Sequence, residues 1–186
     1  MRDLFLKFAE NPDRKSFLAV RQEVLAAKEY QPDSEELDRA DELIDEGKWA
    51  EARVCLQEAL PNLLLSPQAH LLMAAIAEEL GDSGEEQLED FLASTCAEGI
   101  LSTGDGTKDK PYLVLRATDE YDLIEYLEKE PIDEEEVEDG ERSLDRVKCN
   151  DGSELWFDVT EAKARLAQPR DAEEAGEEEE GDEDES

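Results

Sequence analysis

The stretch STGDGTKDKPYLV, residues 102–114, has the residue types that come closest to known binding chemistry. Gly104 and Gly106 are followed by a lysine, as in loops that cradle a phosphate. A P-loop has the pattern GxxxxGK[ST], because several backbone N–H groups and a helix N-terminus must converge on the anion. Here Asp105 lies inside the loop and would repel an anion, and Pro111 leads into a strand-like run. The pattern therefore favours a structural turn over a phosphate or calcium loop.

A second polar group follows this turn at Asp119, Glu120 and Tyr121. If the strand at 111–116 returns the chain beside the turn, the two groups converge on one site for a ligand or a partner. The alternative is helix capping, since acidic side chains in a first helical turn stabilise the helix by about 0.3–1 kcal/mol. The candidate binding residues are Gly104, Asp105, Gly106, Asp119, Glu120 and Tyr121.

The sequence offers few other residues for catalysis. His70 is the only histidine, so the chain cannot form a metal site with several histidines. Any Ser–His or Cys–His catalytic pair would have to use this one residue. It lies in an apolar run at 69–77, which is typical of a buried structural histidine. Cys55, Cys96 and Cys149 form no CxxC pair, and we expect core thiols in a reducing compartment. We therefore predict no catalytic residue, no metal, no cofactor and no enzymatic activity.

The charge balance is strongly acidic, with 54 acidic and 19 basic residues and a net charge of −35. Residues 171–186 contribute −11 of this charge, which leaves −24 on residues 1–170. Such a field repels nucleic acids and anionic membranes, because their affinity for proteins comes largely from Lys and Arg. We expect a protein partner, and the charge favours a basic one. Generic solubility and adaptation to high salt are the alternative interpretations of the charge.

Residues 34–97 show the periodicity of helices joined by short connections. Gly47 and Gly81 stand where helices end. Between them, the segment 66–80 (SPQAHLLMAAIAEEL) begins with a Ser-Pro start signal and is apolar nearly all round. We expect this helix at the centre of the helical layer. Residues 1–30 supply two further helices that cover this layer.

The two helix-ending glycines are 34 residues apart, the period of the tetratricopeptide repeat. The segment EGKWAEARVCLQEAL resembles the turn and second helix of that repeat, with Trp49 at the aromatic position and Ala52 at the small one. The next repeat is degenerate, because Ser83 and Glu86 occupy the corresponding positions. The resemblance implies antiparallel helix pairs and a protein-interaction role.

After residue 98 the composition shifts toward β-formers. The order predicted is a strand at 111–116, a helix capped by Thr118, a solvated loop at 132–141, a β-hairpin and a short helix at 161–166. The hairpin strands, SLDRVKC and SELWFDV, flank a three-residue loop that ends in glycine and fits a type I turn with a bulge.

That hairpin register places Val147 opposite Leu155, so that one face of the sheet is apolar. On the other face, Lys148 opposes Glu154 and predicts an ion pair. Arg146 opposes Trp156 and predicts a cation–π contact. A slip by one residue would set Lys148 against Leu155, which disfavours the alternative register.

These patterns predict an α+β fold in three parts. Residues 1–97 form a TPR-like helical domain of antiparallel helix pairs. It packs against a small α+β domain at 98–168, with an antiparallel sheet and one or two helices, since about 70 residues rarely make a stable core alone. Residues 169–186 form a disordered acidic tail, because they lack apolar area to offset the entropy of ordering.

The second part resembles an uncharacterised bacterial family, domain of unknown function 4919, over residues 98–162. The matching motifs are GDG at 104–106, DEY at 119–121 and FDVT at 157–160. The sequence departs from the family pattern at Arg142, where glutamine is usual. The resemblance implies an architecture and no chemistry.

Three functions are compatible with these patterns. The favoured one is a non-enzymatic protein–protein interaction module with a basic protein partner. The alternatives are a small-ligand-binding or hydrolytic domain that uses the GDG and DEY region, and a structural accessory of a larger complex. The charged N-terminal segment has no apolar signal region and no apolar run reaches the length of a membrane span, so we expect a cytoplasmic protein.

Overall fold

The computed structural model describes residues 1–168, and the acidic tail predicted at 169–186 lies outside them. This part of the chain has eight helices and four strands, which confirms the α+β class. The helices are α1 (Arg2–Glu10), α2 (Arg14–Ala26), α3 (Glu35–Asp45), α4 (Trp49–Leu63), α5 (Pro67–Glu79), α6 (Ser83–Leu101), α7 (Thr118–Tyr126) and α8 (Thr160–Leu166). The strands are β1 (Tyr112–Leu113), β2 (Pro131–Asp139), β3 (Arg142–Cys149) and β4 (Glu154–Asp158).

Local signals set several helix ends. The Ser66 side chain accepts a hydrogen bond from Ala69 N at the start of α5. Gly47 and Gly81 follow α3 and α5 with φ of +72° and +76°, the left-handed conformation that glycine adopts without strain.

Two helix ends differ from expectation. Helix α4 continues through Pro61 to Leu63. Thr118, predicted as the cap of α7, is instead its first residue and makes no capping hydrogen bond.

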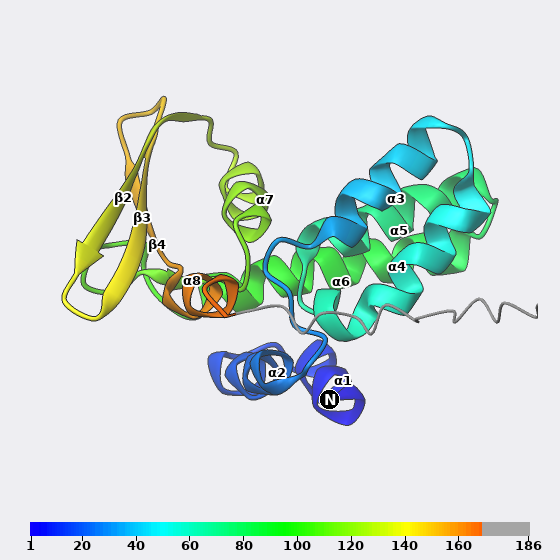
Figure 1. Ribbon diagram of the computed structural model, residues 1–186. Helices are drawn as coiled ribbons and strands as arrows, with labels where there is room; N and C mark the ends of the chain where they lie inside the picture. The colour runs from blue at the N-terminus through cyan, green and yellow to red at the C-terminus, as the bar shows by residue number, and fades with distance from the viewer. Residues whose placement is uncertain (169–186) are drawn as a thin grey trace, which may run out of the picture.

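The core consists of two hydrophobic clusters. The smaller one joins α3, α4 and α5, and α5 also packs against α6 and α7, which agrees with its predicted central place. The larger one joins α1, α2 and α6 to β1, β3, β4 and α7. The helices at the N-terminus therefore share one core with the sheet. Figure 1 shows α7 between the sheet and α3–α6. The domain boundary expected between residues 97 and 98 stays a prediction.

Two large side chains of α6 face solvent although the helical pattern places them inward. Leu88 and Phe91 are 53% and 52% exposed, whereas Leu92 and Cys96 are buried as expected. The buried stripe of α6 is rotated because the helix packs on α5 along one side and on α2 along another. Thr95, Ala97 and Gly99 thus complete the buried surface.

The four strands form one sheet in the order β1-β4-β3-β2. Strand β1 pairs parallel to β4, and the other pairs are antiparallel, so the sheet is mixed where a purely antiparallel one is expected from the sequence. A parallel pair needs a long crossover connection. The chain between β1 and β4 contains α7 and the β2–β3 hairpin, which provides that crossover.

The predicted hairpin register is confirmed. Val147 pairs with Leu155, Lys148 with Glu154 and Arg146 with Trp156. Gly152 closes the turn with φ of +85°, and its N–H donates to Cys149 O at 2.9 Å. The apolar face of the hairpin therefore points to the core.

The acidic segment predicted as a loop at 132–141 is instead mostly strand β2, an edge strand that pairs with β3. Acidic residues are depleted in strands, but here they lie beside basic side chains of β3. Arg146 Nη2 lies 2.6 Å from Glu135 Oε2, and Lys148 Nζ lies 3.5 Å from Asp133 Oδ2. These cross-strand ion pairs allow the strand to form.

The same pairs correct two expected contacts on the outer face of the sheet. Lys148 pairs with Asp133 rather than with Glu154, and Glu154 lies 3.7 Å from Arg146. The cation above the Trp156 ring is Lys108, 5.6 Å from the ring centroid, rather than Arg146.

Candidate functional site

The GDG segment forms a structural turn. Asp105 Oδ1 accepts hydrogen bonds from Thr107 N at 3.2 Å and Thr107 Oγ1 at 2.6 Å. A Cβ at Gly104 would lie 2.3 Å from Pro111 O, and one at Gly106 would lie 2.8 Å from the Tyr112 ring. Both glycines are thus required by close approach of the chain to itself, and Asp105 is engaged within the turn.

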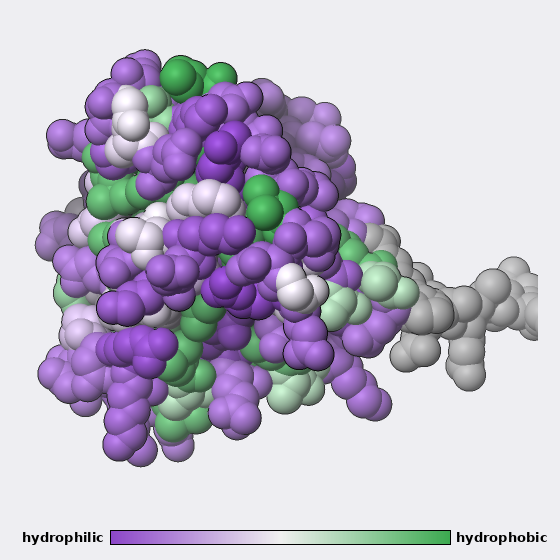
Figure 2. Space-filling view, turned by 90° about the vertical axis from the view of Figure 1, so that its left-hand side faces the viewer, coloured by the Kyte–Doolittle hydropathy of each residue, from purple (hydrophilic) through white to green (hydrophobic). Residues whose placement is uncertain are grey.

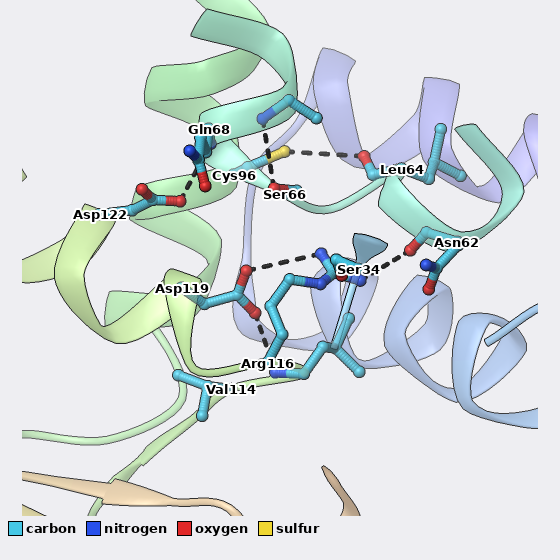
Figure 3. Close-up of polar contacts among 12 residues, drawn as sticks. Ser34, Asn62, Leu64, Ser66, Gln68, Cys96, Val114, Arg116, Asp119 and Asp122 are labelled. Atoms are coloured by element: carbon cyan, nitrogen blue, oxygen red, sulfur yellow. Dashed lines mark hydrogen bonds and ion pairs between the residues drawn. The ribbon is translucent and has the colours of Figure 1, made fainter. Parts of the chain in front are cut away.

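Asp119 belongs to a group of buried polar contacts, the buried seam, that connects the start of α7 to α4 and α5 (Figure 3). Its side chain is 1% exposed, and Oδ2 accepts a hydrogen bond from Leu115 N at 2.9 Å. Its Oδ1 lies 3.5 Å from Arg116 Nη1. Arg116 is fully buried and donates through Nη2 to Asn62 O on α4 at 2.8 Å. Asp119 is therefore inaccessible to a ligand.

Further hydrogen bonds fix the start of α7 on the helical layer. Asp122 Oδ2 accepts from Gln68 N, at the first turn of α5, at 3.0 Å (Figure 3). Tyr30 Oη donates to Leu115 O at 2.6 Å. With one side of α7 held in this way, its opposite side faces the sheet.

Glu120 lies on the side of α7 that faces the sheet. Its side chain is only 5% exposed, and it approaches Asp145 of β3. Asp145 lies on the same sheet face as the buried Val147 and Phe157, because side chains alternate along a strand. Glu120 Oε1 and Asp145 Oδ1 are buried, and no N–H or hydroxyl group of residues 1–168 donates to either oxygen.

Glu120 and Asp145 line a pocket between α7 and the β2–β3 hairpin. Its volume is about 320 Å³. Tyr121 lines it and is 48% exposed, and its hydroxyl donates to Glu134 Oε2 at 2.9 Å. We call this the acidic pocket, and its lining residues are Ala117, Glu120, Tyr121, Glu134, Glu135, Glu136, Asp145 and Val147.

Burial and neighbouring acids shift the proton equilibria of the acidic pocket. Burial, together with the charges of Asp145 and Asp119, raises the pKa of Glu120 to about 9. Glu120 is therefore protonated at neutral pH and shares a hydrogen bond with Asp145. Burial likewise raises the pKa of Asp145. The hydrogen bond to Glu134, with burial, raises the pKa of Tyr121 to about 12.

Only part of this acidic charge is neutralised. Lys163 Nζ lies 2.9 Å from Glu136 Oε2, and Arg146 pairs with Glu135. Within the described part of the chain, no ion pair reaches Glu120, Glu134 or Asp145. Lys163 also lies near Asp145 but pairs with Glu136, so the acidic pocket keeps three carboxyl groups without a paired cation.

Replacing Glu120 with glutamine is expected to raise the free energy of unfolding at about pH 8 by about 2–3 kcal/mol. The folded protein retains the Glu120 proton up to about pH 9, whereas the unfolded chain releases it near 4.5. Stability of the wild type therefore falls as pH rises through this window, and the glutamine variant loses that slope. Urea denaturation at about pH 5 and about pH 8 measures it.

The matched control is Glu125→Gln, at an exposed position of the same helix. If Glu120→Gln and Glu125→Gln show the same pH slope as the wild type, the burial and raised pKa assigned to Glu120 are wrong.

Of the six candidate residues, the structure brings Glu120 and Tyr121 together on the acidic pocket. Gly104, Asp105 and Gly106 form the separate turn, and Asp119 lies in the buried seam. Sequence reasoning missed Asp145. The hairpin register contained the signal, since alternation from Val147 puts Asp145 on the apolar face. A carboxyl group at an inward position breaks the local pattern, which is typical of functional sites.

The lone histidine is structural. His70 is 2% exposed, its Nδ1 lies 2.6 Å from Glu89 Oε2, and its Nε2 lies 3.1 Å from Leu64 O. The Phe5 ring stacks on it at 6.0 Å. With both ring nitrogens engaged, His70 has no free nitrogen for proton transfer or metal binding. Cys96 and Cys149 are buried free thiols, as expected, whereas Cys55 is a free thiol that is only half-buried.

The chain gives no match to protein-family models, to curated proteins or to solved structures. The resemblances to the tetratricopeptide repeat and to the uncharacterised family stay predictions. Within residues 1–168, no group of three or more His, Cys, Asp or Glu side chains could hold a metal ion. In the same part of the chain, no helix is long and apolar enough to cross a membrane.

Proposed function

We propose that the chain is a non-enzymatic protein-interaction module with a basic protein partner. The observation that carries this proposal is the acidic pocket, where Glu120, Glu134 and Asp145 form no ion pair within the described part of the chain. Apart from the proton that Glu120 and Asp145 share, the buried oxygens of this pair have no donor among residues 1–168, and each unmade hydrogen bond costs about 1–3 kcal/mol. A basic partner that supplies N–H donors removes this cost.

The surface around the acidic pocket suits such a partner. Six of the nine residues of β2 are acidic, and β2 is an edge strand with exposed side chains. The face on the side of β2 and β3 is predominantly hydrophilic (Figure 2). A net charge of −35 steers a cationic protein toward the chain and repels nucleic acid. The TPR-like helical layer and a cytoplasmic location belong to the same proposal, and the free thiols support a reducing compartment.

The small-ligand or hydrolytic alternative has less support. It requires the GDG turn and the DEY segment to meet, but Asp105 is held by Thr107 and Asp119 by Arg116. The Glu120–Asp145 pair is the one feature that still supports this alternative. The raised pKa of Glu120, however, is also expected of a carboxyl group in a site that binds a cation.

A synthetic peptide of alternating lysine and glycine is expected to bind the full chain, and a glutamine–glycine peptide is not. Affinity for the lysine peptide should fall at least tenfold as salt rises from about 0.01 M to about 1 M, because screening shortens the Debye length from about 30 Å to about 3 Å. Calorimetry or fluorescence anisotropy measures this change.

Neutralising the pocket tests where the peptide binds. Glu134→Gln with Asp145→Asn should weaken lysine-peptide binding about tenfold, equivalent to about 1.4 kcal/mol. The matched control is Glu78→Gln with Glu79→Gln on α5. It removes the same number of acidic groups at exposed positions that do not line the pocket. Equal affinities for the two double variants, or binding that salt does not weaken, would contradict the proposal.

A further inference from the structure

We infer that the acidic pocket receives a single cationic side chain of the partner, and that it prefers a guanidinium group to an ammonium group. This inference rests on the proposed function and specifies what the partner places at its contact site. Four features of the pocket lead to it: the buried acceptors, the uncompensated charge, the rim tyrosine and the volume.

The two acceptors belong to residues that line the pocket. Glu120 Oε1 belongs to a side chain that is 5% exposed, and Asp145 Oδ1 is also buried, yet neither receives an N–H or hydroxyl donor from residues 1–168. They come from different elements, α7 and β3, and stand close enough for the two carboxyl groups to share a proton. A guanidinium group presents parallel N–H donors from one plane, which matches two neighbouring oxygen acceptors.

Asp145 and Glu134 differ from the other acids of the pocket, because neither forms an ion pair with a residue that the structure describes. Glu135 and Glu136 have basic partners in Arg146 and Lys163. Glu134 is held only by the Tyr121 hydroxyl. A cation that enters the pocket is therefore attracted by Glu134 and Asp145 and does not have to break an existing ion pair.

The rim of the pocket favours a planar cation. The Tyr121 hydroxyl is fixed by Glu134 Oε2 at 2.9 Å, which orients its half-exposed ring. Guanidinium groups stack on aromatic rings and are more weakly hydrated than ammonium groups, so they enter a partly buried site more readily. The pocket volume of about 320 Å³ is large enough to admit one arginine side chain.

A cation in this pocket takes the place of the proton that Glu120 and Asp145 share. Binding should therefore release a proton at neutral pH, and affinity should rise between about pH 7 and about pH 9, where free Glu120 ionises. The charged groups that face Glu120 are Asp119 on its own helix, Asp145 on β3 and Glu134 on β2. Near Asp145 lie Glu136 of β2 and Lys163 of α8. The hydrogen bond to Glu134 keeps Tyr121 protonated below about pH 12.

The test is a titration of the isotope-labelled full chain with N-acetyl-arginine amide, followed by backbone amide shifts. Arginine keeps its charge across this pH range, so a change in affinity reports on the protein. The matched ligand is N-acetyl-citrulline amide, which has nearly the same shape without the charge. We expect shifts at Glu120, Tyr121, Glu134 and Asp145 with the arginine compound, weaker binding of N-acetyl-lysine amide, and no saturable shift with citrulline.

The variant Glu120→Gln distinguishes binding in the acidic pocket from general attraction of a cation to an acidic protein. The wild type should bind the arginine compound about tenfold more tightly at about pH 9 than at about pH 7, and the variant should show no such change. Glu125→Gln, on the exposed side of α7, should retain the wild-type change.

Three results would overturn the inference. They are equal binding of the citrulline and arginine compounds, shifts that lie outside the pocket, and tighter pocket binding of spermidine, which would assign the site to free polyamines. If the lysine–glycine peptide still binds in these cases and still depends on Glu134 and Asp145, only the preference for a guanidinium group fails. If that peptide does not bind at all, the proposed function fails as well.

Discussion

Replacing Arg116 with methionine is expected to lower the free energy of unfolding by about 3–5 kcal/mol. The guanidinium group is fully buried between Asn62 O, at 2.8 Å, and Asp119 Oδ1, at 3.5 Å. Methionine has a similar length but no donors, so it leaves the buried Asp119 carboxylate and the Asn62 carbonyl without their cation. Removal of one partner of a buried ion pair strands the other charge in a medium that solvates it poorly. Chemical denaturation at neutral pH measures the loss.

Two variants control this prediction. Arg39→Met removes an arginine whose partner Glu42 is exposed, and exposed pairs contribute little, so stability should hardly change. Arg116→Met combined with Asp119→Leu removes both buried charges and should recover much of the loss. A single Arg116→Met variant as stable as the wild type would show that the seam does not hold α7 on the helical layer.

Replacing His70 with leucine is expected to lower the free energy of unfolding by about 3–5 kcal/mol near neutral pH. Leucine leaves Glu89 buried in α6 without the imidazolium that lies 2.6 Å from its Oε2. Burial disfavours the charged ring, but hydrogen bonds with Cys96 and Glu89 outweigh it and raise the pKa of His70 to about 10. The pair thus joins α5 to α6 at the base of the helical layer.

The effect of His70→Leu should depend on pH in a defined direction. The pKa of His70 is raised from 6.5 to about 10 by folding, so its stabilising contribution is complete below about pH 6.5 and declines as pH rises toward 10. The cost of the leucine variant should therefore be larger at about pH 6 than at about pH 9.5. The double variant His70→Leu with Glu89→Leu should be more stable than His70→Leu alone. If it is not, Glu89 is not a stranded charge and the pair has another role.

The parts of the fold that follow from local chemistry were predictable. Glycine ends α3 and α5, Ser66 begins α5, and the loop before Ser153 sets the hairpin register residue by residue. Each of these features depends on neighbours within a few positions along the chain. Local signals of this kind agree with the tertiary fold, as is typical of sequences that fold to one structure.

Strand β2 and the parallel β1–β4 pair were not predictable in this way. A run of acids has little strand propensity by itself, and β2 depends on Arg146 and Lys148 of another strand. Strand β1 is two residues long, and its partner lies more than forty residues further along the chain. Interactions between distant segments decide both elements.

The position of the candidate site along the chain was predictable, but the direction of its side chains was not, because that direction depends on distant segments. The DEY segment contains Glu120 and Tyr121, and its place at a helix start was expected from Thr118. Helix capping accounts for acids that face solvent, whereas Glu120 faces the sheet and Asp119 the helical layer. The direction of each carboxyl group depends on what packs on either side of α7, which no local pattern contains.

A basic partner that docks on α7 and the β2–β3 hairpin should leave a defined footprint. Titration of the labelled full chain with the lysine–glycine peptide, followed by backbone amide shifts, tests this most directly. The largest shifts should fall at Glu120, Tyr121, Glu134 and Asp145, and they should disappear at about 1 M salt. Shifts confined to α3–α5 or to residues 169–186, with the pocket unchanged, would contradict the proposed role of the acidic pocket.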